Sequence, residues 1–263
     1  MEKIGSYEFA AEPFHCDFSH RLFLGHLGNH MLNAADYHST DRGFGMSYLN
    51  TIQKTWVLSR LAIEMEVMPK QYERFNVETW VESAMRYFTN RNFRVVSTAS
   101  DGTEKVYGYG RSIWAMIDTE TRQPTDIFAI DDGAINQWIV KDKDCPIDKG
   151  GRVKMSDDAA FVRTIDTHYN DVDVNGHINS VKYIEHVLDL WPLAWYKEHQ
   201  LKRFEIAYVA EAHEGDQLSF YREQTGEQEY CVRIVRSDGT ETCRSKLRFV
   251  SSCEPVDSSA QQK

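Results

Sequence analysis

Apolar side chains recur at helical spacing in two separate stretches of the chain. The members of the first set lie at i, i+3, i+7, i+10 and i+11: Leu24, Leu27, Met31, Ala34 and Ala35. The second set keeps the same period: Val181, Ile184, Val187, Leu188 and Trp191. This spacing puts the apolar side chains on one helix face. We therefore expect two amphipathic helices, with Ser19 as N-cap of the first. Asn179 or Ser180 is the expected N-cap of the second, and Pro192 should end its regular part.

Strand-like runs, rich in β-branched and aromatic residues, lie further along each half. Two of them, at 93–98 and 230–235, precede the same short sequence, Ser-Asp-Gly-Thr-Glu, at 100–104 and 237–241. An Asp-Gly pair between such runs is typical of a hairpin turn. An Arg-Ser pair and a further strand-like run follow in both copies. The shared order of these neighbours indicates an internal duplication.

Each half is thus predicted to be a helix followed by several strands. A helix lying on an antiparallel sheet buries both apolar faces, which is an α+β architecture. We expect a first domain over residues 1–130, a linker over 131–157 where Asp, Gly and Lys accumulate, and a second domain over 158–252. The polar segment 253–263 is expected to be a mobile tail.

Composition narrows the functional class. The formal net charge is −10, whereas a nucleic-acid binder normally carries a basic footprint. No apolar run approaches the length of a membrane span, and the first residues do not resemble a signal peptide, so a cytoplasmic location is expected. The five cysteines show no C-x-x-C spacing, so we expect neither a disulfide framework nor a metal site.

The chemistry is concentrated at Asp173, Asn175 and His177, which alternate along the chain just before the second helix. In an extended or loop backbone, residues spaced by two can share one side. An imidazole can move a proton near neutral pH, a carboxylate can orient it, and an amide can hold a carbonyl oxygen. These groups suit hydrolysis of an activated acyl group. The alternative is an ordinary turn and helix cap, because Asn-Gly is a turn dipeptide.

The stretch 173–184 resembles the signature of the acyl-acyl-carrier-protein thioesterases of plant plastids. Segments 55–57, 77–81 and 110–122 are also similar to that family and occur in the same order, so the resemblance covers roughly residues 7–250. It implies two tandem hot-dog domains, in each of which a long helix packs on an antiparallel sheet. It also implies a thioester hydrolase that uses no cofactor and acts on a fatty acyl group attached to acyl carrier protein.

The resemblance adds Glu211, because the family pairs its Asp-x-Asn-x-His motif with a glutamate in a Tyr-x-x-Glu-Cys pattern. The matching residues here are Tyr208, Glu211 and Ala212. Ala212 stands where the family has cysteine, so no thiol nucleophile is available at that position. We therefore expect either direct attack by water or a different nucleophile. Glu211 and His177 are both candidates for the general base, with Asp173 orienting His177 and Asn175 stabilising the oxyanion.

The first half is expected to lack a working site. Aligning the two predicted helices places Asp17, Ser19 and Arg21 on Asp173, Asn175 and His177. In the family the first half mainly shapes the acyl pocket. Because the carrier is acidic, a local basic patch is expected to bind it. The candidates form two clusters: Lys141, Lys143, Lys149, Arg152 and Lys154, or Arg86, Arg91 and Arg94.

The sequence leaves other functions open. An acyl-CoA thioesterase of the same fold differs only in the group that carries the acyl chain. A non-catalytic acyl-binding protein would not need Asp173, Asn175, His177 or Glu211, and a hot-dog dehydratase would also use a His and a carboxylate. A tandem hot-dog chain already contains a pseudo-dimer, so both a monomer and a homodimer are compatible with the sequence.

Overall fold

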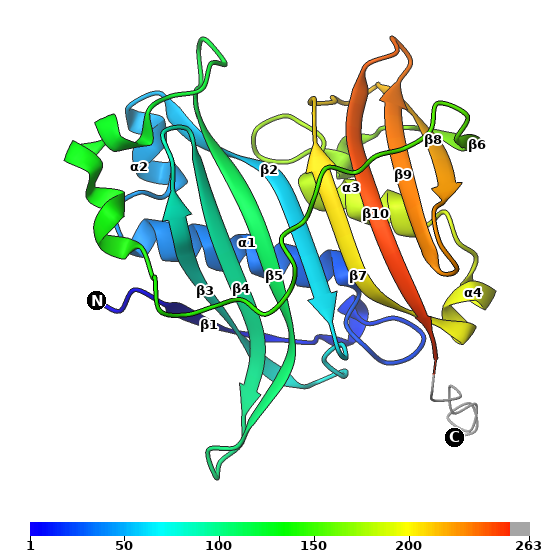
Figure 1. The fold of residues 1–263 in the computed structure, drawn as a ribbon, viewed down its shortest axis with the longest axis horizontal. Helices are drawn as coiled ribbons and strands as arrows, with labels where there is room; N and C mark the ends of the chain where they lie inside the picture. Colours follow the sequence, from blue (N-terminus) through cyan, green and yellow to red (C-terminus); the bar gives the residue numbers. More distant parts are fainter. Residues whose placement is uncertain (253–263) are drawn as a thin grey trace. The chain divides into compact units, whose positions relative to one another are not determined.

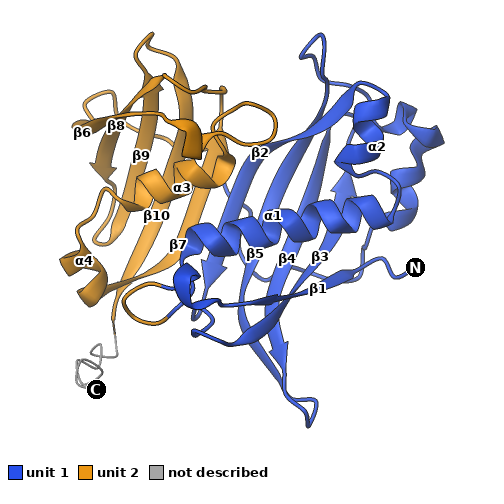
Figure 2. Cartoon of the chain, turned by 180° about the vertical axis from the view of Figure 1, so that it is seen from behind, with its two compact units in different colours: residues 1–16, 21–151 blue, residues 17–20, 152–263 orange. Residues whose placement is uncertain are grey.

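The computed structural model describes residues 1–252 and separates into two compact units (Figures 1 and 2). Unit 1 contains Met1–Cys16 and Arg21–Gly151, and unit 2 contains Asp17–His20 and the chain from Arg152 onward. The segment predicted as a linker, 131–157, is divided between the units at Gly151. The expected tail, 253–263, lies outside the described residues.

Unit 1 is an antiparallel sheet with a long helix on one face. The strands follow the order β1-β3-β4-β5-β2. Their bounds are β1 Gly5–Ala10, β2 Lys54–Met65, β3 Arg74–Ala84, β4 Phe88–Thr98 and β5 Glu104–Asp118. The helical segments are η1 Pro13–His15, α1 Leu24–Asp41, α2 Met46–Thr51, η2 Ile127–Ala129 and η3 Asp131–Trp138. Helix α1 crosses the sheet (Figure 2) and buries Leu27, Met31 and Ala34 completely, so its predicted apolar face is confirmed.

Unit 2 repeats this architecture with a shorter helix. The strand order is β7-β10-β9-β8-β6, with every adjacent pair antiparallel. The bounds are β6 Ala160–Asp166, β7 His199–Tyr208, β8 Gln217–Gln224, β9 Glu229–Arg236 and β10 Glu241–Ser251. The helical segments are η4 Tyr169–Asp171, α3 Ser180–Leu188 and α4 Leu193–Glu198. The predicted α+β class is therefore confirmed for both halves.

The two Asp-Gly turns have the same conformation, as the duplication predicts. Gly102 and Gly239 both have φ of 84°, in the left-handed region that favours glycine. Each glycine N–H donates to the carbonyl three residues earlier at 2.9 Å, and the carboxylate of each preceding aspartate accepts an N–H two residues further on at 2.9 Å. The turn chemistry is thus local to each copy of the repeated sequence.

A second correspondence joins the segments that lead into the helices. Segment η1 precedes η4 by the same offset along the chain as α1 precedes α3 (169 − 13 = 180 − 24). The isolated antiparallel bridges Cys16–Leu22 and Val172–Ile178 are related by that offset as well (172 − 16 = 178 − 22). The two halves therefore share the loop that enters the helix as well as the sheet.

Three details differ from expectation. A strand precedes each helix, whereas the sequence pattern begins each half with the helix. The prediction that Ser19 caps α1 is wrong, because Phe23 is the N-cap and the Ser19 hydroxyl donates instead to Asp17 Oδ1 at 2.6 Å. Helix α3 ends at Leu188, so Trp191 lies beyond it. Asn179 is confirmed as the N-cap of α3, where its side chain accepts the Val181 N–H at 2.9 Å.

Within residues 1–252, no helix is both long and apolar enough to cross a membrane.

Candidate active site

The site loop, residues 172–178, is closed by its own aspartate. Asp173 Oδ1 accepts the backbone N–H of Asn175 at 2.8 Å and that of His177 at 3.4 Å. Gly176, at φ of 79°, occupies the left-handed position that the turn requires, and its N–H donates to the Asp173 carbonyl at 3.0 Å. The carboxylate of Asp173 therefore binds the backbone of the loop that presents His177.

Glu211 reaches the loop through a bulge at the end of β7. Regular pairing with β10 ends at Tyr208, and the N–H groups of Val209 and Ala210 then both donate to the Thr242 carbonyl, at 2.8 and 3.2 Å. A bulge of this kind adds a residue on one strand and redirects the side chains after it. It directs the following residue, Glu211, out of the regular sheet.

The loop and the strand end are joined by one backbone hydrogen bond. The Ile178 N–H donates to the Ala212 carbonyl at 2.8 Å. This bond brings the His177 ring beside the Glu211 carboxylate, with Nε2 and Oε2 3.4 Å apart. The side chains remain open to solvent, at 26% exposure for His177 and 37% for Glu211, and Asn175 is exposed as well. A His–carboxylate pair in contact with water has the geometry for proton transfer from an attacking water.

The segment that carries Glu211 is held rigidly by unit 2. We call residues 209–216 the Glu211 loop. Arg236 Nη1 donates to the Glu211 carbonyl at 3.1 Å, and the buried Thr167 hydroxyl donates to the His213 carbonyl at 2.7 Å. Asp216 Oδ2 accepts the His213 N–H at 2.8 Å. Sequence reasoning missed these supports, because no spacing connects Thr167 or Arg236 to the motif.

A second imidazole lies beside the first. The rings of His177 and His213 have centroids 5.1 Å apart and an interplanar angle of 79°. The sequence offered one signal that was not used: His213 follows Glu211 by two positions, the same spacing as in the Asp-x-Asn-x-His motif.

The N–H groups at the start of α3 are largely engaged within unit 2. Ile178 donates to Ala212, Asn179 donates to the Asp171 carbonyl at 2.8 Å, and Val181 donates to the Asn179 side chain. Unbonded N–H groups at a helix start can help bind an oxyanion. Because those of α3 are already bonded, the exposed carboxamide of Asn175 is the better donor for that task.

No described cysteine is placed to act as a nucleophile in unit 2. Ala212 is fully buried, so a side chain at that position does not face solvent. Cys231 and Cys243 are also buried, and burial raises the pKa of both thiols. This arrangement favours attack by water over covalent catalysis by a thiolate. Within residues 1–252, no group of three or more His, Cys, Asp or Glu side chains is arranged to hold a metal ion.

The corresponding loop of the first half has the same backbone but different side chains. Asp17 Oδ1 accepts the Ser19 N–H at 2.8 Å, as Asp173 does for Asn175. At the position equivalent to His177, Arg21 Nη1 donates to the Met68 carbonyl at 3.1 Å. The Leu22 N–H donates to the Pro69 carbonyl at 3.0 Å, the counterpart of the Ile178–Ala212 bond. Met68 therefore stands where unit 2 has Glu211, and the proton-transfer pair is lost.

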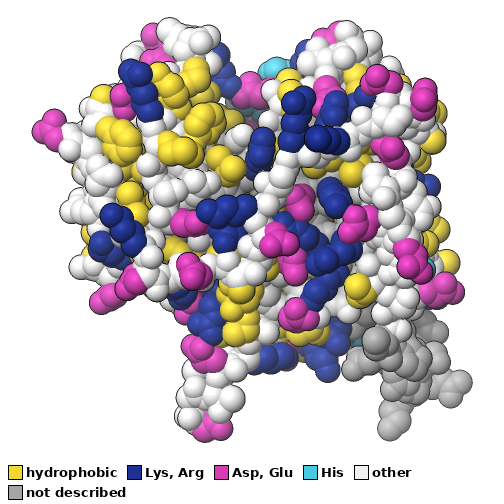
Figure 3. All heavy atoms as spheres, viewed as in Figure 1, with side chains coloured by type: hydrophobic (Ala, Val, Ile, Leu, Met, Phe, Trp, Pro, Cys, Tyr) yellow, Lys and Arg dark blue, Asp and Glu magenta, His cyan; other side chains and the backbone are white. Residues whose placement is uncertain are grey.

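Several of the basic side chains considered for carrier docking are already neutralised. Lys143 pairs with Glu78 at 2.8 Å and Lys149 with Glu82 at 3.0 Å. Arg91 is only 4% exposed, so its assignment to a surface cluster is wrong. In the face seen in Figure 3, basic and acidic side chains are interspersed. Lys141, Arg152 and Lys154 remain exposed.

Comparison with known proteins identifies the family. The acyl-ACP thioesterase N-terminal domain model matches residues 6–131, and the C-terminal domain model matches residues 154–251. The chain belongs to the acyl-ACP thioesterase family. It is 49% identical to an acyl-ACP thioesterase from Bacteroides thetaiotaomicron, with a TM-score of 0.86 over 94% of this chain and 98% of that one.

Plant relatives are more distant. The chain is 26% identical to a chloroplastic palmitoyl-acyl carrier protein thioesterase of Gossypium hirsutum, over 79% of this chain and 50% of the relative. It thus spans about half the length of that curated relative. The structure of the 12:0-ACP thioesterase from Umbellularia californica is similar at a TM-score of 0.81, with 21% identity over 96% of this chain and 99% of that one. These likenesses support the tandem hot-dog fold.

Proposed function

We propose that this protein hydrolyses the thioester of acyl-acyl carrier protein and releases a free fatty acid, which ends chain elongation in fatty acid biosynthesis. The observation that supports it most directly is the solvent-accessible pair of His177 Nε2 and Glu211 Oε2, 3.4 Å apart, in which His177 lies on the loop that also presents Asn175. The first half has Arg21 and Met68 in their places, so one catalytic site per chain is proposed.

In the proposed mechanism the Glu211 carboxylate takes a proton from a water as the water oxygen attacks the thioester carbon. The carbonyl π electrons move to oxygen, and the Asn175 carboxamide donates a hydrogen bond to the resulting oxyanion. The tetrahedral intermediate collapses to the carboxylic acid and breaks the carbon–sulfur bond. The departing thiolate takes a proton from protonated His177, which recovers one from Glu211. Asp173 contributes by holding the loop in shape.

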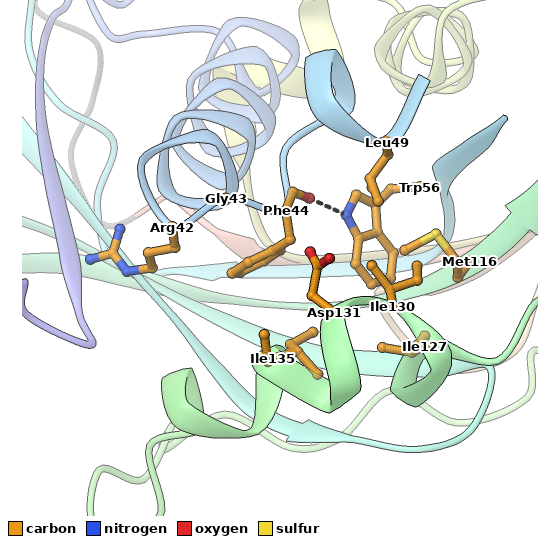
Figure 4. Close-up of a pocket in the computed structure, with 11 residues that line it drawn as sticks. Arg42, Gly43, Phe44, Leu49, Trp56, Met116, Ile127, Ile130, Asp131 and Ile135 are labelled. Carbon is orange, nitrogen blue, oxygen red and sulfur yellow. Dashed lines mark hydrogen bonds between the residues drawn. The ribbon is translucent and has the colours of Figure 1, made fainter. Parts of the chain in front are cut away.

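We further propose that the acyl chain occupies a pocket in unit 1 (Figure 4). Its lining is mostly apolar and includes Phe44, Leu49, Trp56, Met116, Ile127 and Ile135. Arg42 and Asp131 supply its charged side chains. Phe44 lines this pocket, whereas Met31 and Met65 are buried in the core of unit 1 and do not line it. An apolar lining matches a hydrocarbon chain, which gains free energy by leaving water.

The test is free-acid release from a panel of acyl-ACP and acyl-CoA thioesters of varied chain length. We expect turnover of the carrier-protein series, and a kcat about 10²–10⁴-fold lower for Glu211→Gln and for His177→Ala, because each loses a proton-transfer group. Glu214→Gln is the matched control, since Glu214 is an exposed carboxylate in the same loop and should keep wild-type activity.

The outcomes separate the competing functions. Preference for the CoA series would assign an acyl-CoA thioesterase instead. Tight binding of acyl thioesters without release of acid would indicate an acyl-binding protein, and the hydrolase proposal would then be wrong. That the protein is cytoplasmic and that it forms a homodimer both remain predictions.

A further inference from the structure

The His177 ring needs a group that fixes its orientation. The group expected to do so was the Asp173 carboxylate, but that carboxylate binds the loop backbone. Asp173 Oδ1 is bonded to the backbone N–H groups of Asn175 and His177. In unit 2 the ring lies beside the Glu211 carboxylate, with Nε2 and Oε2 3.4 Å apart, and beside the His213 ring, with centroids 5.1 Å apart. The Glu211 contact is the one that changes during proton transfer, which leaves His213 as the constant neighbour.

The geometry of the two rings is that of an attractive aromatic pair. An interplanar angle of 79° with centroids 5.1 Å apart is an edge-to-face arrangement. Such a contact favours one rotation of each ring about its Cβ–Cγ bond over the others. For His177, that rotation is the one that directs Nε2 toward Glu211 Oε2.

His213 can act as a fixed reference because its backbone is anchored on both sides. Its N–H donates to Asp216 Oδ2 at 2.8 Å, and its carbonyl accepts from the Thr167 hydroxyl at 2.7 Å. The same hydroxyl donates to the Asp216 carbonyl at 2.9 Å, which closes the turn. Thr167 is 1% exposed, so this support is packed inside unit 2. His213 itself is nevertheless exposed to solvent.

We propose that His213 is a positioning residue, whose ring holds the His177 imidazole edge-on so that Nε2 stays directed at Glu211. This role rests on the proposed hydrolase function. It requires an aromatic ring at position 213 and no proton transfer by that ring. It also concerns the chemical step and not the binding of the acyl chain.

The test compares His213→Phe and His213→Ala with the wild-type chain on the best thioester substrate. His213→Phe keeps a ring and should retain kcat within about twofold. His213→Ala loses the contact and should lower kcat about tenfold with KM unchanged, because an edge-to-face pair is worth up to about a factor of ten. Equal loss in both variants, a normal kcat in His213→Ala, or a change confined to KM would each overturn the proposal.

A second measurement keeps this test separate from the hydrolase proposal. If the wild-type chain releases no acid from any thioester, the hydrolase proposal fails. The NMR signals of the His177 ring then decide the positioning role independently. The proposal expects one well-defined ring environment in the wild type and His213→Phe, and a broadened or shifted one in His213→Ala. Identical His177 signals in all three proteins would contradict it.

Discussion

The His186 ring donates a hydrogen bond from Nε2 to Asp171 Oδ1 at 2.9 Å. The second oxygen of Asp171 accepts the backbone N–H of His168 at 2.9 Å, and its carbonyl accepts the N–H of Asn179. The mostly buried carboxylate of Asp171 therefore connects helix α3 to the start of the segment that contains the site loop, and its backbone carbonyl holds the end of that segment. Asp171 thus closes the η4 turn and adds a contact to His186.

Replacing this carboxylate should loosen the site loop. We expect Asp171→Asn to lower the free energy of unfolding by about 1–3 kcal/mol, because a buried hydrogen bond to a charged group is lost. Urea unfolding measures this directly. A double-mutant cycle with His186→Phe should show a coupling energy, and strictly additive effects would mean that the pair contributes no interaction of its own.

Restoring the family's cysteine should not restore a nucleophile. The residue at 212 is fully buried, so Ala212→Cys is expected to add a thiol that does not react with a thiol reagent in the folded protein. Overpacking should also lower stability by about 1–3 kcal/mol. Titration of reactive thiols before and after unfolding checks the first point. Recovery of activity by Ala212→Cys in the Glu211→Gln background would contradict it.

One buried and one half-buried histidine, His38 and His30, should make the protein sensitive to acid. Burial lowers the pKa of His38 to about 3 and that of His30 to about 4. The unfolded chain therefore binds protons below about pH 6.5 that the folded chain does not, so stability is complete above that pH and falls as the pH drops toward 4. At pH 5 the loss is about 2 kcal/mol for His38. It is smaller for the less buried His30, because solvent screens its charged form.

His38→Gln tests this acid sensitivity. The amide can keep the hydrogen bond that His38 Nε2 makes to the Lys3 carbonyl at 3.0 Å, but it does not titrate. Urea unfolding at pH 7.5 and pH 5 should show a drop in stability that is smaller in the variant by about 2 kcal/mol. An equal drop in both proteins would show that His38 does not contribute.

The buried Arg91 is expected to cost stability. Its guanidinium is bonded to the hydroxyls of Thr79 and Ser39, and burial lowers its pKa to about 9. Both hydroxyls donate elsewhere, to the carbonyls of Asn92 and Ala35, so removing the guanidinium leaves neither without an acceptor. We expect Arg91→Met to raise the free energy of unfolding by about 1–4 kcal/mol. A lower melting temperature for Arg91→Met would show that the buried cation is net stabilising.

The proposed acyl pocket can be tested by filling it. Ala134 lines the pocket, and Ala134→Leu adds three carbon atoms there. Displacing about three methylene groups of the substrate should weaken binding of the longest accepted chains by about 2 kcal/mol and shift preference to shorter ones. Relative kcat/KM across the chain-length panel measures the shift. Unchanged preference would place the acyl chain elsewhere.

Features that depend on neighbouring residues were predictable from the sequence alone. The Asp-Gly turns, the apolar helix faces and the Asn179 cap follow from dihedral preference, side-chain periodicity and a short-range side-chain hydrogen bond. The same holds for the site loop, which Asp173 closes with bonds to Asn175 and His177. The duplication, visible as sequence similarity, therefore reappears as matching backbone hydrogen bonds in the two halves.

Tertiary structure decided the contacts that span long stretches of chain. His177 and Glu211 are far apart in the sequence, and the β7 bulge and the Ile178–Ala212 bond bring them together. Bulge position and strand register result from packing of the whole sheet, which no local pattern encodes. Arg91 was predicted to be a surface cation, but packing of the sheet buries it. Packing also places the ring of His213 against that of His177, a contact that was not predicted from the sequence.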